Sequence, residues 1–167
     1  MPPCPDFHYT PDDIAASLLE DIEFQPNEII LEPCKGRGSQ GFYKALIARG
    51  VEVEWCESDE GRDFFEYHPP FKYSKVITNP PYQNNGEDGE RYNIVWPFMQ
   101  HCFELCGDEC WLLLNLQMLN SLTPKRLAEI KDNGFAMTHM RVLNIKQWRG
   151  RYYWICFKKG ADSMIRF

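Results

Sequence analysis

Four consecutive residues, Asn79, Pro80, Pro81 and Tyr82, have the types and spacing most suited to chemistry. They follow the apolar run 76–78, which predicts a buried strand, and ligands of open α/β sheets bind beyond the carboxyl ends of such strands. The Asn79 side-chain oxygen and a backbone carbonyl of the proline pair can each accept an N–H bond from an amine on a planar group. Such acceptors make the lone pair of the amine available to an electrophile.

Tyr82 adds a flat face on which a base could stack, since enzymes that modify a base within a duplex must extrude it from the stack. The alternative is a rigid turn without chemistry, because two prolines fix the backbone and remove two donors. At roughly 5% usage of each residue type, the tetrapeptide would arise by chance in only about one chain of this length in a thousand. We therefore favour the chemical interpretation.

A second candidate element is the glycine-containing loop that follows the apolar segment 29–31. Glu32 and Pro33 precede Gly36-x-Gly38, and a helical pattern begins near residue 39. Glycines let the backbone approach a ligand closely, and a helix N-terminus offers free N–H groups. The order of strand, loop and helix predicts a cradle for a nucleotide-like ligand.

This loop alone leaves two classes of enzyme open. Gly41 completes the pattern Gly-x-Gly-x-x-Gly of dinucleotide-binding proteins. Glu57, which follows the next predicted strand, could bind the adenosine ribose in either a dehydrogenase or a methyltransferase. A solvated carboxylate at a strand end is the simpler interpretation of Glu57. The tetrapeptide beginning at Asn79 favours a methyltransferase.

Taken together, these motifs resemble the amino-group DNA methyltransferases that use S-adenosylmethionine, particularly those acting on N6 of adenine. The residues that carry the resemblance are Tyr9-Thr10-Pro11, Glu32-Pro33-x-x-Gly36-x-Gly38 and Asn79-Pro80-Pro81-Tyr82. The resemblance implies that the first group holds the methionine end of the cofactor, the second forms its glycine loop and the third is catalytic, with Asn79 also near the cofactor. Thr10 before Pro11 also predicts a helix N-cap.

The segment between these motifs matches the family less closely. Asp63 and Phe64 resemble the acid that binds the cofactor adenine and the aromatic residue that packs on its ring. However, only five residues separate Glu57 from Asp63. This leaves no room for the helix and strand that usually intervene, so we expect this part of the sheet to be trimmed or rebuilt.

The predicted elements alternate along the chain. We expect helices near 11–22, 39–49, 93–106 and 124–133, and strands at 28–32, 51–56, 74–78, 110–115, 136–143 and 152–158. Alternation predicts an α/β fold with a mostly parallel sheet and helices on both faces. The last two strands predict an antiparallel C-terminal hairpin at the edge. The fold class is that of a Rossmann-like methyltransferase sheet.

The charge is unevenly distributed. The net charge of the chain is −6, yet residues 125–167 contain ten Lys or Arg against three Asp or Glu. Lys146, Trp148, Arg149 and Arg151 form a basic, aromatic hairpin tip that could contact phosphates and stack on bases. A solvated tip is the alternative. We expect a nucleic acid, most simply DNA, as the partner.

Length and composition limit the remaining possibilities. The 167 residues suit one domain, with no separate target-recognition domain, so short loops, another copy or a partner subunit would supply specificity. No apolar stretch approaches the roughly 20 residues of a membrane span, and we expect a cytoplasmic protein. The polar segment 83–91 suggests a lid over the substrate.

The seven cysteines fit reduced thiols better than a disulfide framework. Cys102, Cys106 and Cys110 recur every four residues but lack a Cys-x-x-Cys pair, so we expect them to pack as small apolar side chains rather than bind a metal.

Several substrates remain open. The tetrapeptide also occurs in enzymes that methylate protein glutamine amides, and related enzymes act on RNA adenine or on N4 of cytosine. A non-catalytic partner subunit that binds the cofactor or nucleic acid is a further alternative.

Overall fold

The computed structural model describes residues 9–85 and 91–165. Its strands are β1 (Ile29–Glu32), β2 (Glu52–Trp55), β3 (Tyr73–Thr78), β4 (Gln83–Asn85), β5 (Arg91–Asn93), β6 (Cys106–Asn115), β7 (Phe135–Leu143) and β8 (Tyr152–Lys159). Its α-helices are α1 (Asp12–Leu18), α2 (Gly41–Ala48), α3 (Val95–Leu105), α4 (Leu116–Asn120) and α5 (Pro124–Asp132), with short 3-10 helices η1 (Leu19–Asp21), η2 (Ser58–Glu60) and η3 (Phe64–Glu66).

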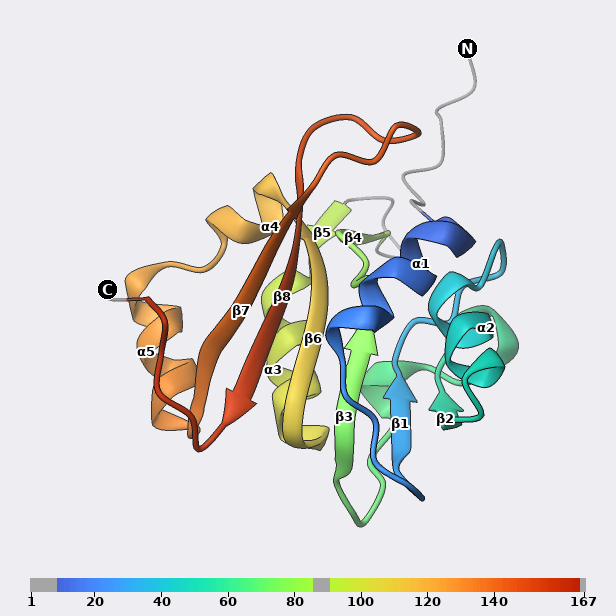
Figure 1. Cartoon of the computed structure of the whole chain (residues 1–167). Coiled ribbons are helices and arrows are strands. Elements are labelled where there is room, and N and C mark those ends of the chain that lie inside the picture. Colours follow the sequence, from blue (N-terminus) through green and yellow to red (C-terminus); the bar gives the residue numbers. More distant parts are fainter. Residues whose placement is uncertain (1–8, 86–90, 166–167) are drawn as a thin grey trace.

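Six strands form the central sheet in the order β2-β1-β3-β6-β8-β7 (Figure 1). The first four of these are parallel, whereas β8 pairs antiparallel with both β6 and β7. The predicted mixed sheet with an antiparallel C-terminal hairpin is therefore confirmed. The hairpin enters the sheet with its second strand, so β8 lies inside and β7 forms the edge.

Helices cover both faces of the sheet, and the side chains of β6 show why. Cys110, Leu112 and Leu114 belong to one buried cluster, and Trp111 and Leu113 belong to the other. Successive side chains of a strand point to opposite faces, so an uninterrupted apolar strand needs a cover on each side. The sheet is thus the middle of three layers.

One layer contains α1 and α2. Ala15 and Leu18 of α1 and Phe42 of α2 pack in the same cluster as the sheet residue Trp154. The rings of Phe42 and Trp154 stack with centroids 5.2 Å apart. This packing fixes α1 and α2 beside one another over β1, β3 and β8.

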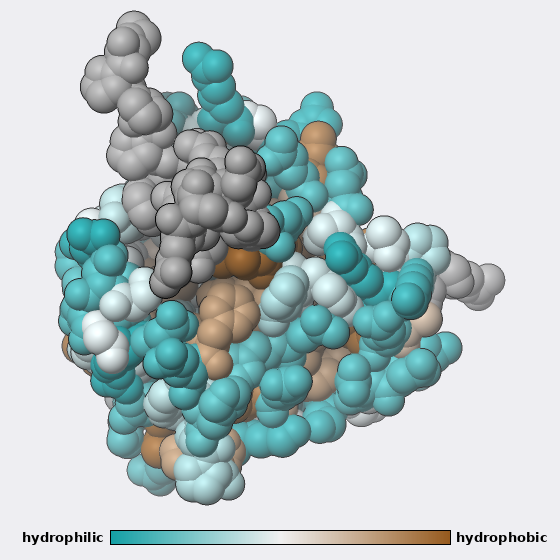
Figure 2. Space-filling view, turned by 180° about the vertical axis from the view of Figure 1, so that it is seen from behind, coloured by the Kyte–Doolittle hydropathy of each residue, from teal (hydrophilic) through white to brown (hydrophobic). Residues whose placement is uncertain are grey.

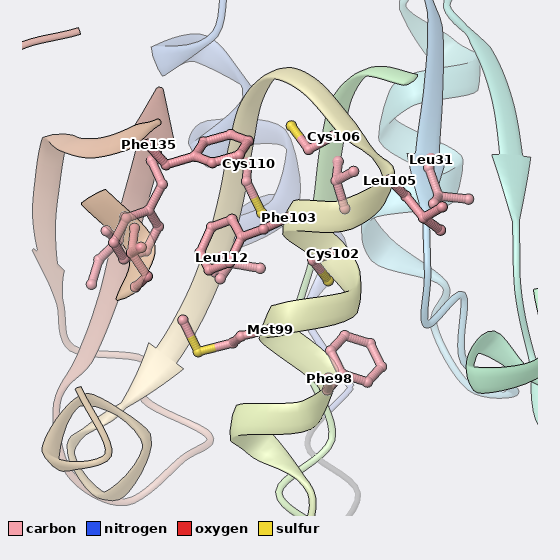
Figure 3. Packing of buried hydrophobic residues seen from close by; sticks show 14 of the residues in the cluster. Leu31, Phe98, Met99, Cys102, Phe103, Leu105, Cys106, Cys110, Leu112 and Phe135 are labelled. Carbon is pink, nitrogen blue, oxygen red and sulfur yellow. The ribbon is translucent and has the colours of Figure 1, made fainter. Parts of the chain in front are cut away.

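The opposite layer is built mainly on α3, with α4 and α5 beside it. Figure 3 shows Phe98, Met99 and Cys102 of α3 among the apolar side chains of the same cluster, which includes Leu112 of the sheet. On the outside of this layer, hydrophilic side chains cover most of the surface, with apolar side chains visible between them (Figure 2). That distribution is typical of amphipathic helices on a sheet.

The regularly spaced cysteines pack as the sequence predicted. Cys102, Cys106 and Cys110 lie among the apolar side chains of the core (Figure 3). Each is 0% exposed, and burial raises the pKa of all three thiols. Within the described residues, no group of three His, Cys, Asp or Glu side chains is arranged to hold a metal ion.

The predicted start of β6 was wrong. The strand begins at Cys106, directly after α3, rather than at Cys110. Tyr73 at the start of β3 pairs with Cys106, so pairing with a neighbouring strand extends β6 through polar residues that local sequence assigns to a loop.

Helix α4 was also missed; the Asn115 side chain caps it by accepting a bond from the Met118 amide at 2.9 Å.

The segment between β2 and β3 is shortened, as expected. An isolated antiparallel bridge joins Glu57 to Arg62, and only η2 and η3 lie between the two strands. As a result β2 is an edge strand.

The predicted lid lies partly outside the described residues. Its ends pair as strands β4 and β5, whereas residues 86–90 are not among those described. The lid therefore stays a prediction. No helix within residues 9–85 and 91–165 combines the length and apolar character needed to cross a bilayer.

We expect Leu112→Ala to lower the free energy of unfolding by about 2–5 kcal/mol, because it opens a cavity in the central strand. Leu112 is 0% exposed. Leu116→Ala is the matched control, because Leu116 is 53% exposed, and it should change stability by less than about 0.5 kcal/mol. Urea denaturation measures both, and equal losses would contradict the assigned core.

Candidate active site

The candidate site lies where three neighbouring parallel strands end. Glu32 ends β1, Thr78 ends β3 and Asn115 ends β6, and these strands are adjacent in the sheet (Figure 1). Asn79 follows Thr78 directly. The sequence prediction that the tetrapeptide lies just beyond a buried strand is confirmed, since β3 is buried along its last four residues.

Thr10 reaches this strand end from the N-terminal segment. The Asn79 side-chain amide donates to the Thr10 hydroxyl, with 3.3 Å between Nδ2 and Oγ1. The predicted N-cap role of Thr10 was wrong: Pro11 is the N-cap residue of α1, which has no side-chain cap bond. Because Pro11 takes the N-cap position, α1 begins at Asp12. The Thr10 hydroxyl is therefore not used as a helix cap and contacts Asn79 instead.

The glycine loop holds the same N-terminal segment. A Cβ atom on Gly38 would lie 2.6 Å from the Tyr9 ring, and one on Gly36 would lie 3.1 Å from it. Gly36 also has a φ of +78°, which disfavours other residues. The loop therefore needs glycine at both positions to let the Tyr9 ring lie against its backbone.

Glu57 supports this loop. Its carboxylate accepts a hydrogen bond from the Gly36 amide at 2.8 Å and a longer one from Asp59 at 3.4 Å. Glu57 is buried at 8% exposure. The structure thus gives Glu57 a loop-supporting contact that the sequence did not predict, and its ribose contact stays a prediction.

Glu32 is buried beneath the loop. It is 1% exposed, accepts a bond from the Cys34 amide at 3.1 Å and lies beside Thr78. The pKa of the Glu32 carboxyl is raised to about 8, chiefly by burial and in smaller part by the nearby Glu57 charge, although the contacts with Thr78 and Cys34 act in the opposite direction. The neighbouring Pro33 is also buried.

The predicted adenine-contacting pair occupies η3. Asp63 is exposed and caps η3 by accepting a bond from the Phe65 amide at 2.8 Å. Phe64 is 4% exposed, and its ring contacts those of Phe98 and His101. Phe64 is therefore a core residue, whereas the next residue, Phe65, has an exposed side chain. The cofactor roles of Asp63 and Phe64 stay predictions.

The tetrapeptide itself is largely enclosed. Pro80 is buried, and Asn79, Pro81 and Tyr82 are partly buried. The side chain of Tyr82 packs against the core cluster of α3, and its hydroxyl lies beside Tyr152 and Asn115. Burial and the neighbouring Tyr152 phenol raise the pKa of Tyr82.

Sequence reasoning missed Asn115 and Tyr152, which lie beside the Tyr82 hydroxyl, and Thr78, which lies beside Glu32. Each belongs to an element that was correctly predicted or lies next to one, but no local pattern indicates which residues of β6 and β8 end beside Tyr82. The pairing of Asn115 with Tyr152 across these strands is what brings them together.

The basic hairpin tip, residues 144–151, begins at the same edge of the sheet. Leu143 and Asn115 both pair with Tyr152, so the tip extends beyond the carboxyl ends of the parallel strands (Figure 1). Lys146, Arg149 and Arg151 are exposed, whereas the ring of Trp148 contacts that of Tyr152 at 4.7 Å. The residues predicted to contact nucleic acid thus lie at the sheet edge that carries the tetrapeptide, and their role stays a prediction.

These residues fit an adenosyl cofactor. The Tyr9 ring lies directly on the glycine backbone, where a side chain at position 36 or 38 would meet it, and ring and backbone together form one wall of a candidate cradle. Glu57 and Glu32 place two carboxyl groups at the loop, and Thr10 connects the loop to the Asn79 amide. An amine acceptor beside a nucleotide-type cradle suits group transfer between a cofactor and an amine.

No protein-family model matches the chain. A segment is 42% identical over 50 residues to a tRNA1(Val) (adenine(37)-N6)-methyltransferase of Aliivibrio fischeri, and it covers 24% of this chain and 21% of that enzyme. The match thus spans only about a fifth of that relative.

Solved structures are similar over nearly the whole chain. A Listeria monocytogenes structure described as a class I S-adenosylmethionine-dependent methyltransferase has a TM-score of 0.65 at 16% identity, covering 94% of this chain and 62% of its own. A Pyrococcus horikoshii structure described as an RNA methyltransferase has a TM-score of 0.63 at 20% identity, covering 92% and 87%. The chain has the class I methyltransferase fold. Ligands of open α/β sheets bind beyond the carboxyl ends of the parallel strands. Asn79 lies at that edge of the sheet, directly after β3.

Glu32→Gln is expected to flatten the pH dependence of stability. The pKa of Glu32 is about 8 in the fold against an ordinary 4.5, so between these values the folded state retains a proton that the unfolded state has released. The free energy of unfolding therefore falls as the pH rises through this window.

Urea denaturation at pH 5 and pH 8 measures the effect. We expect the variant to lose about 2–4 kcal/mol less than the wild type across this interval. Glu20→Gln is the control, because Glu20 is exposed. A fall as steep in Glu32→Gln as in the wild type would contradict the buried, protonated carboxyl.

Proposed function

We propose that this protein transfers a methyl group from S-adenosylmethionine to the N6 amine of adenine in a nucleic acid. The observation that carries the proposal is the contact between Asn79 and Thr10, which joins the amine-accepting tetrapeptide to the segment that packs on the glycine loop. The fold supports methyl transfer, and the similar tRNA enzyme from Aliivibrio fischeri acts on an adenine N6 amine.

The cofactor would lie in the cradle formed by Tyr9, Gly36 and Gly38, with Glu57 and Asp63 toward its adenosyl part. When bound, S-adenosylmethionine supplies an electrophilic methyl group whose carbon–sulfur bond breaks as the new carbon–nitrogen bond forms. The N-terminal residues Thr10 and Pro11 would lie toward its methionine end.

The residues after β3 would prepare the amine. The Asn79 side-chain oxygen and the Pro80 backbone carbonyl each accept a hydrogen bond from one N–H group of the amine. This leaves the lone pair of the amine nitrogen available for the incoming methyl group. Pro80 and Pro81 hold the backbone carbonyl stiffly because their φ angles are fixed. The nitrogen becomes cationic during transfer and then releases a proton to solvent. No strong general base has to act first, so orientation supplies most of the rate enhancement.

Tyr82 would provide the stacking face for the extruded adenine. Its ring is partly buried, and its hydroxyl lies next to Tyr152 and Asn115. These contacts would fix the orientation of the ring. The position of the base would thus be set by β6 and β8 as well as by the tetrapeptide.

The hairpin tip would bind the phosphate backbone near this base. Lys146, Arg149 and Arg151 extend beyond the sheet edge that carries Asn79, and cationic side chains there can neutralise phosphates. DNA is the substrate expected from the motif resemblance. RNA is the second candidate, because the curated relative methylates a tRNA.

We expect Asn79→Ala to abolish methyl transfer, with a loss of at least about a hundredfold, because one acceptor of the amine protons is removed. The assay uses labelled S-adenosylmethionine with duplex DNA, single-stranded DNA and mixed RNA, followed by digestion and identification of the labelled nucleoside. Asn133→Ala, an exposed amide in the capping position of α5, is the matched control and should keep wild-type activity.

Label in N6-methyladenine that disappears in Asn79→Ala supports the proposal, and the nucleic acid that carries it distinguishes DNA from RNA. Label in N4-methylcytosine would correct the base. Cofactor binding without label on any nucleic acid would contradict the proposal and favour a protein amide or a non-catalytic subunit.

Replacing Lys146, Arg149 and Arg151 together by Gln should weaken nucleic-acid binding by about tenfold or more at moderate salt and reduce the slope of log K against log salt by about two to three. Fluorescence anisotropy with a labelled oligonucleotide at several salt concentrations measures both.

The control replaces Lys72, Lys131 and Lys159, which are exposed and lie at or near the amino end of the parallel strands. It removes the same charge from the opposite edge. If the two triple variants lost equal affinity, the binding would reflect overall charge and the hairpin assignment would be wrong.

A further inference from the structure

We infer that Thr10 is a positioning residue that sets the orientation of the Asn79 amide, an inference that rests on the proposed function. The motif resemblance assigns Thr10 only to the methionine end of the cofactor. The structure instead places its hydroxyl against the side chain that is to accept the amine proton.

The geometry of the amide explains how this contact acts. Asn79 Nδ2 donates to Thr10 Oγ1 at 3.3 Å. In a planar carboxamide the nitrogen and oxygen occupy opposite corners, so a partner for Nδ2 also determines the direction of Oδ1. With Nδ2 turned to Thr10, the other corner is an acceptor rather than a donor, as an incoming amine requires.

Thr10 itself is tightly held. It is 5% exposed, and its carbonyl accepts a bond from the Ser39 hydroxyl at 2.7 Å. A Cβ atom on Gly41 would lie 2.4 Å from the same carbonyl oxygen, so the glycine allows the N-terminal segment to lie directly on the start of α2. A side chain anchored in this way can serve as a fixed reference for Asn79.

The same contacts link two parts of the site. The segment that orients Asn79 also lays the Tyr9 ring on the glycine loop. A displacement of this segment would therefore disturb the acceptor and the cradle together, whereas loss of the Thr10 hydroxyl alone should disturb only the acceptor. This difference separates positioning from cofactor binding.

The test compares Thr10→Val, which has nearly the same shape without the hydroxyl, with Thr10→Ser, which keeps it. We expect Thr10→Val to lower kcat for methyl transfer by about tenfold to a hundredfold, while calorimetry shows an S-adenosylmethionine Kd within about threefold of wild type. Thr10→Ser should restore most of kcat. Thr123→Val, which removes the hydroxyl that caps α5, is the control and should leave kcat unchanged.

A second readout does not depend on activity. The Asn79 side-chain amide signals in a ¹⁵N–¹H spectrum are assigned by their loss in Asn79→Ala, and they should shift in Thr10→Val but hardly move in Thr10→Ser or Thr123→Val. If the wild type methylates no nucleic acid, the proposed function fails, and the spectra still decide whether Thr10 orients Asn79.

Three outcomes would overturn the inference. One is unchanged kcat and unchanged Asn79 signals in Thr10→Val. Another is a loss of cofactor affinity that accounts for the fall in kcat, which would return Thr10 to a cofactor role. The third is an equal loss of kcat in Thr10→Ser, which would show that the hydroxyl is not the group that matters.

Discussion

The candidate site depends on the close approach of the N-terminal segment to the start of α2. Gly41 has no side chain, and any Cβ there would meet the Thr10 carbonyl at 2.4 Å. This approach brings Thr10 within reach of Asn79 and lays Tyr9 on the glycine loop. Residues separated by about 70 positions in the chain are thereby held in one cluster.

The environment of the two glutamates at the loop shows how burial divides their roles. The Glu57 carboxyl group accepts hydrogen bonds from the backbone amides of Gly36 and Asp59. These bonds hold the glycine loop in place. Glu32 lies deeper, and the cost of burying its charge raises its pKa to about 8. Near neutral pH, the loop thus rests on one carboxyl group that is largely protonated.

The fold and the position of the motifs could be predicted from the sequence because they depend on local patterns. Apolar runs such as residues 76–78 and 110–114 give strands, and the polar tetrapeptide directly after β3 had to lie at its carboxyl end. The shortened segment between Glu57 and Asp63 was equally predictable, since five residues cannot form both a helix and a strand.

The contacts within the site could not be predicted in this way. Thr10 before Pro11 has the local signature of an N-cap, yet tertiary packing gave its hydroxyl to Asn79. Asn115 and Tyr152 meet beside Tyr82 only because β8 is inserted between β6 and β7, and strand register is a property of the whole sheet. Phe64 and Phe65 are indistinguishable by type, and only the tertiary fold buries the first in the core cluster and leaves the second exposed.

The most direct test of the account is a crystal structure of the protein grown with S-adenosylhomocysteine. We predict that the ligand lies against the glycine loop and the Tyr9 ring, with its sulfur directed toward Asn79 and its adenosyl part near Glu57 and Asp63. A ligand bound elsewhere, or one whose sulfur is directed away from Asn79, would contradict the assignment of this sheet edge as the site of methyl transfer.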